Sequence, residues 1–224
     1  MTGNASAGNH LAELYRDIER YYSGKIEAHG ATPLGVAWPC RPTQELRFVQ
    51  LLRVCEADPS FSLNDIGCGY GALLAFLAKR HRRKKIDYLG LDLSAQMIAE
   101  ARRLWGKRPH AEFLVANASP RVADYSLASG IFNVKLNQSE VLWTHFVETT
   151  LTAMRASSRR GFAVNFLAAL EQGEAQTELY RTLPGVWQSY CETNFHAQVE
   201  VVQGYGMREF TLLVRLPSAP VNAP

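Results

Sequence analysis

The chain has 224 residues, of which 47% are hydrophobic and 20% are charged, so its length and composition suit one α/β domain with a buried core and exclude a disordered chain. Its net charge of +3 is too small to indicate a nucleic-acid partner or a membrane partner, and no apolar stretch has the length of a membrane span. The four cysteines are scattered without a C-x-x-C pair and the N-terminus is polar, so we expect a cytoplasmic protein without a zinc site, a disulfide framework or a signal peptide.

The N-terminal part of the chain predicts two helices. Residues 1–9 look unstructured, and the apolar residues that follow recur at helical spacing: Leu11, Leu14, Tyr15, Ile18 and Tyr22. Residues 24–42 are rich in glycine and proline and separate this helix from a second one, for which Thr43 is the expected N-cap. Because this part of the chain has little core to fill, we expect residues 10–57 to form a helical lid over the rest of the domain.

From residue 61 onward, strands and helices alternate. The expected strands are 61–66, 86–91, 112–116, 125–128 and 161–166, and the expected helices are 72–78, 94–104 and 141–154. Alternation of this kind predicts a mostly parallel sheet with helices on both faces. Two final strands, 198–202 and 209–216, are joined by a segment with two glycines, which indicates a hairpin and adds an antiparallel strand. We therefore expect a single domain, 1–224, whose core spans 61–216 and whose tail, 217–224, is flexible.

A glycine-rich turn joins the first of these strands to the helix after it. Gly67, Gly69 and Gly71 let the backbone turn sharply and approach a ligand without Cβ clashes, as in nucleotide-binding folds. The same stretch also fits the dinucleotide pattern G-x-G-x-x-A, so the turn by itself leaves the class of nucleotide open.

Two acidic residues narrow this choice. Asp65 stands two residues before the first glycine, where dinucleotide-binding strands usually carry an apolar residue, and a carboxylate there suits a ligand with a positive amino group. Asp92 ends the second strand and can accept hydrogen bonds from both hydroxyls of a ribose. Both acids could instead cap helices, but their position on either side of one glycine turn favours ligand binding.

Two stretches resemble the first two motifs of the class I S-adenosyl-L-methionine-dependent methyltransferases. They are Leu63-Asn64-Asp65-Ile66-Gly67-Cys68-Gly69-Tyr70-Gly71 and Tyr88-Leu89-Gly90-Leu91-Asp92-Leu93-Ser94-Ala95-Gln96-Met97-Ile98. The resemblance covers nearly the whole chain, about 15–216, and is to small bacterial members whose substrates are mostly unassigned. It implies a Rossmann-like, doubly wound sheet of seven strands, mostly parallel with one antiparallel strand, and S-adenosyl-L-methionine as the cofactor.

The resemblance also assigns contacts with the cofactor. It implies that the following residues lie against it: Asp65, Gly67, Cys68, Gly69, Asp92, Leu93, Met97 and Ser129. The methionine moiety would lie over the glycine turn, the ribose on Asp92, and the adenine beside Leu93 and Met97. After the third strand the family usually has an acid that accepts a hydrogen bond from the adenine amino group. Asn117 holds that place here, followed by Ala118, and its side-chain oxygen can still accept this bond.

The methyl acceptor is expected at the end of the fourth strand, which faces the methyl group in this family. The residues expected to bind it there are Gly130, Phe132 and Asn133, next to Ser129, with Asn165 at the end of the fifth strand. This stretch lacks the Asn/Asp-Pro-Pro-aromatic run of enzymes that methylate bases or glutamine amides. Asp124 begins the fourth strand and so lies at the wrong edge of the sheet to hold magnesium for catechol-type chemistry. We therefore expect neither a base-modifying enzyme nor a metal site.

Aromatic and polar side chains gather in the expected lid. Tyr22 would cover the sulfonium and Arg47 would bind the methionine carboxylate. Lys25 or His29 would meet an anionic acceptor, and Trp38 would border it. Each of these side chains also has a structural interpretation, in which the aromatic residues pack in the core and the charged residues are solvated.

A general base is needed only when the acceptor is protonated at the working pH. The candidates for a direct part in catalysis are His145, His29 and Tyr22. His145 lies on the helix after the fourth strand, where a lone histidine is more often structural.

The sequence thus predicts a metal-independent methyltransferase that acts on a small molecule by in-line transfer. Oxygen is favoured as the acceptor atom over nitrogen or sulfur, no nucleic-acid or membrane partner is expected, and the oligomeric state is not specified. Two alternatives stay open: a Rossmann-type NAD-dependent oxidoreductase, and a non-catalytic module that binds the cofactor. The first would carry an apolar residue in place of Asp65, and the second would have no reason to retain Asp65 and Asp92.

Overall fold

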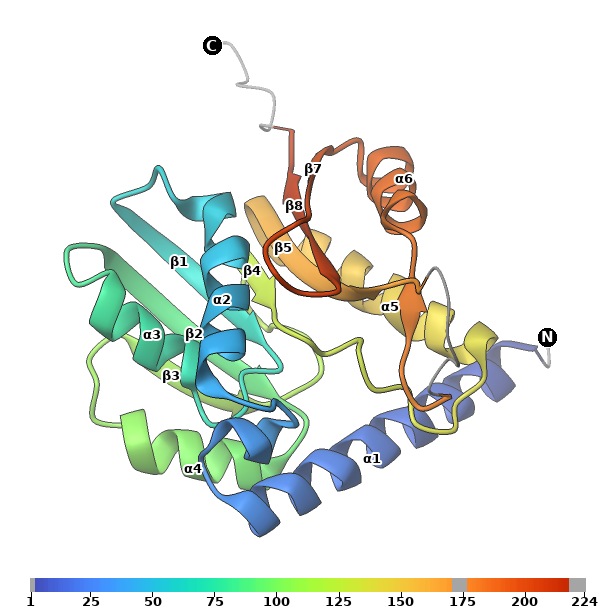
Figure 1. Cartoon of the computed structure of the whole chain (residues 1–224), viewed down its shortest axis with the longest axis horizontal. Helices are drawn as coiled ribbons and strands as arrows, with labels where there is room; N and C mark the ends of the chain where they lie inside the picture. The colour runs from blue at the N-terminus through green and yellow to red at the C-terminus, as the bar shows by residue number, and fades with distance from the viewer. Residues whose placement is uncertain (1–2, 171–176, 218–224) are drawn as a thin grey trace.

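One mixed sheet organises the molecule (Figure 1). The computed structural model describes residues 3–170 and 177–217. Within them the strands are β1 (Ser60–Ile66), β2 (Lys85–Asp92), β3 (Ala111–Val115), β4 (Ala123–Ala128), β5 (Ser158–Ala168), β6 (Arg181–Thr182), β7 (Gln198–Val202) and β8 (Glu209–Arg215). Their spatial order is β3-β2-β1-β4-β5-β8-β7, with β6 paired to the end of β5. β8 runs antiparallel to both of its neighbours, and the other pairs are parallel.

The expected Rossmann-like sheet with one antiparallel strand is confirmed, but the expected count of seven strands is wrong. The sheet has eight strands, because the two-residue strand β6 extends it beside β5. So short a strand has no hydrophobic period to detect. The sequence interpretation also missed α6 (Pro184–Phe195), whose apolar residues do not gather on one side as a helical stripe would.

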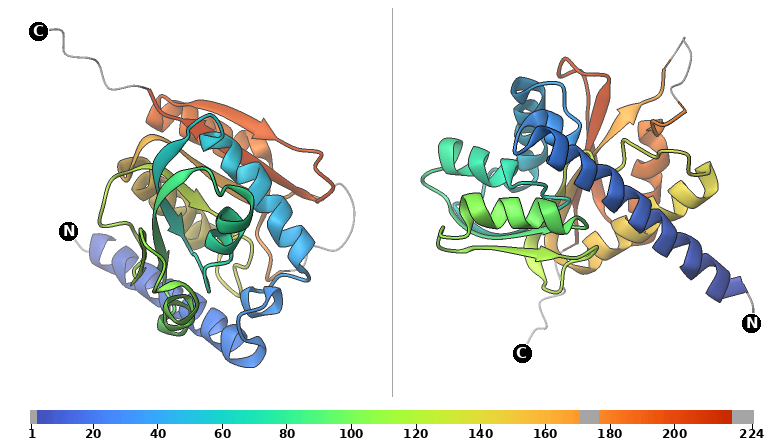
Figure 2. Two further views of the ribbon diagram at one scale, coloured as in Figure 1. Left: turned by 90° about the vertical axis from the view of Figure 1, so that its left-hand side faces the viewer. Right: turned by 90° about the horizontal axis from the view of Figure 1, so that it is seen from below.

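Helices cover both faces of this sheet (Figure 2). They are α1 (Gly3–His29), α2 (Arg41–Leu51), α3 (Ala72–Arg80), α4 (Ala95–Trp105), α5 (Glu140–Ala156) and α6, with the 3-10 turns η1 (Pro33–Val36) and η2 (Leu52–Cys55). One apolar cluster joins α2, α3 and α4 to β1 and β4. A second joins α1, α5 and α6 to the opposite face, with Trp143 and Trp187 fully buried in it. Successive residues of a strand point to opposite faces, and most residues of β1 and β4 are buried, so both strands contribute to both clusters.

The N-terminal helix is longer than expected. α1 begins at Gly3 instead of residue 10 and continues through Gly24 to His29. Gly24 lies on the exposed side of this helix. The N-cap of α2 is Cys40 and not Thr43, whose hydroxyl instead donates to the Cys40 carbonyl at 3.0 Å. The expected tail lies outside the described residues from position 218 onward.

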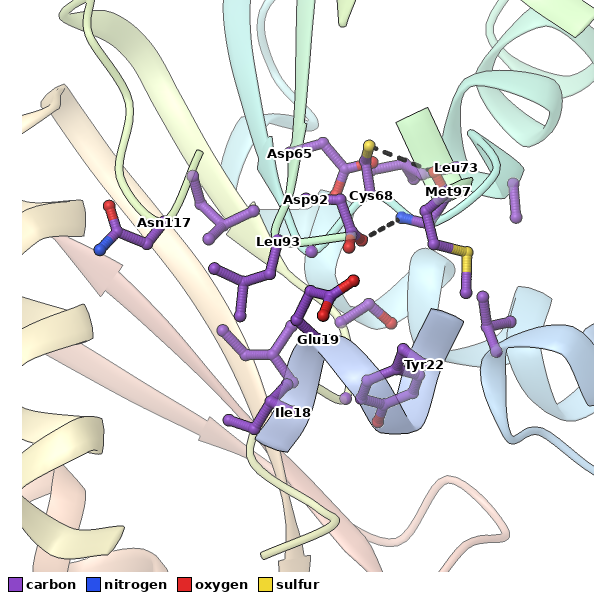
Figure 3. Close-up of a pocket in the computed structure, with 18 of the residues that line it drawn as sticks. Ile18, Glu19, Tyr22, Asp65, Cys68, Leu73, Asp92, Leu93, Met97 and Asn117 are labelled. Carbon is purple, nitrogen blue, oxygen red and sulfur yellow. Dashed lines mark hydrogen bonds between the residues drawn. The ribbon is translucent and has the colours of Figure 1, made fainter. Parts of the chain in front are cut away.

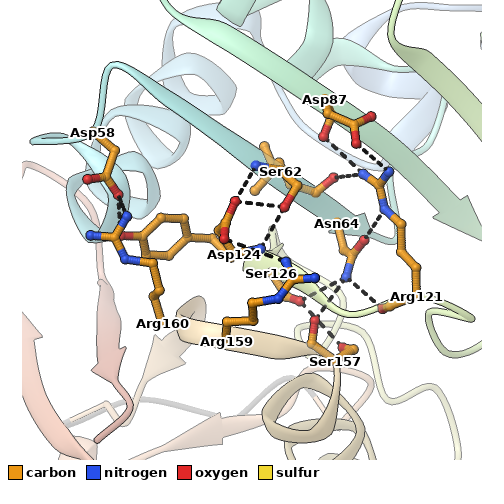
Figure 4. A network of polar contacts seen from close by, with 12 residues as sticks. Asp58, Ser62, Asn64, Asp87, Arg121, Asp124, Ser126, Ser157, Arg159 and Arg160 are labelled. Carbon is orange, nitrogen blue, oxygen red and sulfur yellow. Dashed lines mark hydrogen bonds and ion pairs between the residues drawn. The ribbon is translucent and has the colours of Figure 1, made fainter. Parts of the chain in front are cut away.

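The amino-terminal edge of the parallel strands carries a network of paired charges (Figure 4). Asp124, at the start of β4, accepts hydrogen bonds from the Ser62 backbone and hydroxyl at 2.7 and 2.8 Å. Arg121 pairs with Asp87 at 2.9 Å. Asp124 therefore lies at the edge opposite the glycine turn, as expected. Among the described helices, none is both long and apolar enough to cross a membrane.

Candidate active site

A cleft lies at the carboxyl edge of the sheet, where β1 and β4 diverge into connections on opposite faces. This is the position at which open α/β sheets bind ligands. α1 crosses its mouth, and the cleft holds about 960 Å³ of space including the part that is open to solvent. It is lined by Tyr15, Ile18, Glu19, Tyr22, Val36, Trp38, Gln44, Phe48, Asp65, Ile66, Gly67, Cys68, Gly69, Ala72, Leu73, Asp92, Leu93, Met97, Ala116, Asn117, Ser129, Gly130, Ile131, Phe146 and Thr150.

The glycine turn forms one wall of this cleft. Gly67 and Gly69 have φ angles of 72° and 54°, in the left-handed region that glycine adopts at little cost. A Cβ on Gly67 would stand 2.3 Å from the Ile131 side chain, and a Cβ on Gly69 would stand 2.8 Å from that of Val36. Only a bare backbone therefore fits between β1 and the segments that face it.

Asp92 projects from the end of β2 beside this turn (Figure 3). Its two carboxylate oxygens accept hydrogen bonds from the backbone N–H groups of Gly69 and Ser94, both at 2.9 Å. Burial raises the pKa of Asp92 to about 6, although these backbone bonds act in the opposite direction. Each oxygen keeps a free lone pair, so the carboxylate is held in place and can still accept hydrogen bonds from a ligand.

Asp65 is buried behind the turn at 3% exposure. The hydroxyl of Tyr88 donates to it at 2.6 Å. Burial raises the pKa of Asp65 to about 7; the hydrogen bond from Tyr88 opposes the rise and the charge of Asp92 adds to it. Within the described residues, no lysine, arginine or histidine lines the cleft. Its ionisable side chains are therefore mostly acids, which suits a ligand that carries positive charge.

Most of the residues expected at the cofactor line this one cleft. They are Tyr22, Asp65, Gly67, Cys68, Gly69, Asp92, Leu93, Met97, Asn117 and Ser129. Ala118 is exposed and does not line it. The side chain of Tyr22 is half-buried, and its desolvation raises the pKa of the phenol.

Arg47 is placed differently from the expectation. Its guanidinium is buried and pairs with the carboxylate of Glu209 through two hydrogen bonds, one of them at 2.7 Å. It also stacks on Trp38, 3.6 Å from the ring centre. Arg47 does not line the cleft, so its charge is already satisfied by Glu209 and is not offered to a methionine carboxylate.

Asn165 links Glu209 to Gly130, which lies just after the end of β4. The Asn165 amide donates to Glu209 at 3.0 Å and accepts from the Gly130 backbone at 2.8 Å. A Cβ on Gly130 would stand 2.2 Å from the Trp38 ring. These five residues form a closed ring of contacts, and only Trp38 and Gly130 of the five line the cleft. Asn165, expected to bind the acceptor, is instead a fully buried link between β5 and β8.

Other residues expected near the acceptor lie away from the cleft. Phe132 is fully buried and stacks on Phe166 in the core, and Asn133 is buried with no hydrogen bond between its side-chain amide and a described residue. Lys25 lies over the Tyr21 ring, and His29 is exposed at the end of α1. His145 is exposed on the outer side of α5. Among the residues that the structure describes, neither a basic lid nor a histidine lines the cleft.

Several lining residues were not anticipated. They include Tyr15, Ile18 and Glu19; the last two lie three and four residues after Tyr15, so they share with it and with the expected Tyr22 the side of α1 that faces the cleft. Phe146 and Thr150 of α5 show the same spacing. This periodicity was visible in the sequence, but it predicts only that these residues share a face and not what the face contacts.

Comparisons with known proteins agree with this architecture. Residues 64–161 match the family described as methyltransferase domain. A Mycobacterium tuberculosis protein named as a methyltransferase, Rv1506c, is 40% identical over 168 residues, which are 75% of this chain and 100% of that protein. A SAM-dependent methyltransferase of Leishmania major has a TM-score of 0.61 at 12% identity, over 90% of this chain and 82% of that one. The magnesium protoporphyrin IX methyltransferase of Synechocystis with bound SAH has a TM-score of 0.58 at 12% identity, over 79% and 83%.

Proposed function

The chain belongs to the S-adenosyl-L-methionine-dependent methyltransferases, and we propose that it methylates a small molecule, with oxygen as the favoured acceptor atom. S-adenosyl-L-methionine is its cofactor. One observation carries the proposal: one cleft combines the bare glycine turn with Asp65 and Asp92. The largely apolar lining, together with the residues of α1 that close one side of the cleft, supports a small acceptor over a macromolecular one.

The residues of the cleft fit this cofactor. Asp65 is buried, its pKa is raised by burial, and a positive amino group nearby would restore its ordinary ionisation. We propose that the methionine moiety lies along Gly67, Cys68 and Gly69, and that its amino group lies near Asp65. The ribose hydroxyls would meet the free lone pairs of Asp92, and the adenine would lie beside Leu93, Met97 and Asn117.

The sulfonium of the bound cofactor supplies an activated methyl group, so the protein mainly has to align the acceptor and exclude water. We propose that Ser129 and Gly130, at the end of β4, form the wall beside the acceptor. Trp38 would close the same side, because it lies against Gly130 and is held by Arg47. Tyr22 would cover the sulfonium as a neutral phenol, since burial raises its pKa and keeps its proton in place.

The charge of the cleft changes what acceptor we expect. An anionic acceptor would have to approach Glu19, Asp65 and Asp92 without a lysine, arginine or histidine among the described lining residues. We therefore propose an uncharged acceptor, in which a hydroxyl group is methylated, and no longer an anionic one. Neither a metal nor the predicted histidines take part in this proposal.

Two measurements test it. Calorimetry with S-adenosyl-L-methionine, S-adenosylhomocysteine and NAD should show binding of the first two. Incubation with methyl-labelled cofactor and matched panels of neutral alcohols and phenols, amines, thiols and carboxylates should then show label transfer to the hydroxyl panel. Transfer to carboxylates or to a protein or RNA would reject the proposed acceptor class while leaving the cofactor assignment in place.

A further inference from the structure

Glu19 lies on the side of α1 that faces the cleft (Figure 3). It is the one lining carboxylate that comes from a helix rather than from a strand end. The Ser23 hydroxyl donates to its Oε1 at 2.7 Å. Its Oε2 accepts no hydrogen bond from the described residues, so this oxygen is free to accept one from a ligand.

The carboxylate of Glu19 points toward that of Asp92 in the close-up view, and its charge is one cause of the raised pKa of Asp92. No cationic side chain among the described residues lines the cleft to separate them. Two acids that face each other in this way repel when both are ionised. A group with two hydrogen-bond donors between them would satisfy both oxygens and relieve the repulsion.

Hydrogen bonds fix the position of Glu19 relative to Asp92 and the residues that follow it. The hydroxyl of Ser23, one turn further along α1, lies 2.7 Å from the Ser94 hydroxyl, from which it can accept, and 3.1 Å from the side-chain oxygen of Gln96. The backbone of Ser94 in turn donates to Asp92 at 2.9 Å. Because Ser23 also donates to Glu19, the two carboxylates are joined by a short series of hydrogen bonds through Ser23 and Ser94.

We propose that Glu19 is a second acceptor for the vicinal hydroxyls of the cofactor ribose, opposite Asp92. This rests on the proposed function, in which the ribose lies at Asp92. A cis-diol offers two O–H donors, and both Asp92 oxygens already accept one backbone hydrogen bond each. Each hydroxyl has one proton, so Asp92 would accept from one hydroxyl and Glu19 Oε2 from the other, instead of Asp92 accepting from both. In this arrangement α1 recognises the cofactor directly and is more than a cover over it.

Calorimetry with S-adenosylhomocysteine tests this without an acceptor. We expect Glu19→Ala to weaken binding about tenfold, and Glu19→Gln, which keeps one acceptor oxygen, to weaken it two- to fivefold, as for a charge-assisted hydrogen bond. Glu13→Gln is the matched control, because Glu13 is exposed on the same helix and lies outside the cleft. It should leave the affinity unchanged. Thermal unfolding of each free variant shows that the fold is intact.

An analogue of S-adenosylhomocysteine that lacks both ribose hydroxyls separates a direct contact from an indirect one. The wild type should bind the analogue more weakly, and the difference between wild type and Glu19→Ala should disappear. The proposal is overturned if Glu19→Ala binds S-adenosylhomocysteine as the wild type does, or if its loss is equally large with the analogue. Failure of the wild type to bind S-adenosylhomocysteine at all would instead reject the proposed function.

Discussion

The two edges of the parallel sheet hold aspartates in opposite electrical surroundings. At the amino edge, Asp124 and Asp87 pair with Arg159 and Arg121 (Figure 4). At the carboxyl edge, Asp65 and Asp92 line a cleft with no basic side chain among the described lining residues. The pKa values follow this difference. Burial raises those of Asp65 and Asp92 to about 7 and about 6.

Burial by itself would also raise the pKa of Asp124, but hydrogen bonds from Ser62 and the charges of Arg159 and Arg160 outweigh it and lower the pKa. The carboxylates of Asp124 and Asp87 at the amino edge therefore have positively charged partners within the chain. The carboxyl edge has acids that lack a positive partner, and such an arrangement is expected where a cationic ligand binds. Glu209 is an instructive exception, since it is buried at the carboxyl edge and has Arg47 as its partner.

The largest expected effect comes from replacing Glu209, the buried partner of Arg47. Glu209→Ala leaves the guanidinium of Arg47 buried without its partner and removes the acceptor of the Asn165 amide. We expect a loss of about 3–5 kcal/mol in the free energy of unfolding, measured by urea denaturation. Glu200→Ala is the control, because Glu200 makes an exposed pair with Arg53 and should cost less than about 1 kcal/mol. Equal losses would show that burial of the pair has no energetic consequence.

The pH dependence of stability should differ in sign between the edges. In the folded protein Asp65 keeps its proton up to about pH 7, whereas in the unfolded chain it loses it near pH 4. Its contribution to stability is present below pH 4 and is lost as the pH rises toward 7. Asp65→Asn should therefore gain stability relative to the wild type between pH 5 and pH 7.5, on the order of 2 kcal/mol.

Asp124→Asn provides the contrast in the same urea titrations. The lowered pKa of Asp124 means that its contribution is present above about pH 4 and is lost only in more acidic solution. The stability difference between this variant and the wild type should stay constant from pH 5 to pH 7.5. A constant difference for Asp65→Asn as well would contradict the comparison of the two edges.

Ligand binding should depend on one edge alone. Asp92→Ala should weaken binding of S-adenosylhomocysteine at least tenfold, about 1.4 kcal/mol, because it removes a charged acceptor from the cleft. Asp124→Asn should bind S-adenosylhomocysteine as the wild type does. Calorimetry at pH 7.5 measures both, and an unchanged affinity for Asp92→Ala would remove Asp92 from the ribose site.

The smallest effect is expected at the exposed part of the amino edge. Asp87 is largely exposed, with 57% of its side chain accessible, and its pair with Arg121 is screened by solvent. Asp87→Asn should cost less than about 1 kcal/mol in urea denaturation and should leave S-adenosylhomocysteine binding unchanged. A larger loss would mean that the network of Figure 4 is cooperative.

The sequence alone determined the sheet and the cofactor. The hydrophobic periodicity of a strand or a helix is a local pattern. The bounds of β1, α3, β2 and α4 therefore lie within two residues of the expected ones. Gly67 and Gly69 come after β1, and Asp92 is the last residue of β2. The carboxyl ends of neighbouring parallel strands share one edge of the sheet, so these residues lie close together. The short strand β6 and the helix α6 were missed, because neither has a clear hydrophobic period to reveal it.

Only the tertiary structure decided the charge of the cleft and the partner of each ionic side chain. Arg47 and Glu209 are far apart in sequence, and no local pattern predicts that they pair. Once they do, Arg47 no longer offers positive charge to the cleft, while Lys25, His29 and His145 lie outside its lining. No sequence pattern singled out Glu19, and it became a candidate for ligand binding only because α1 packs opposite Asp92. Local sequence specifies backbone geometry, but electrostatic surroundings depend on contacts between distant segments.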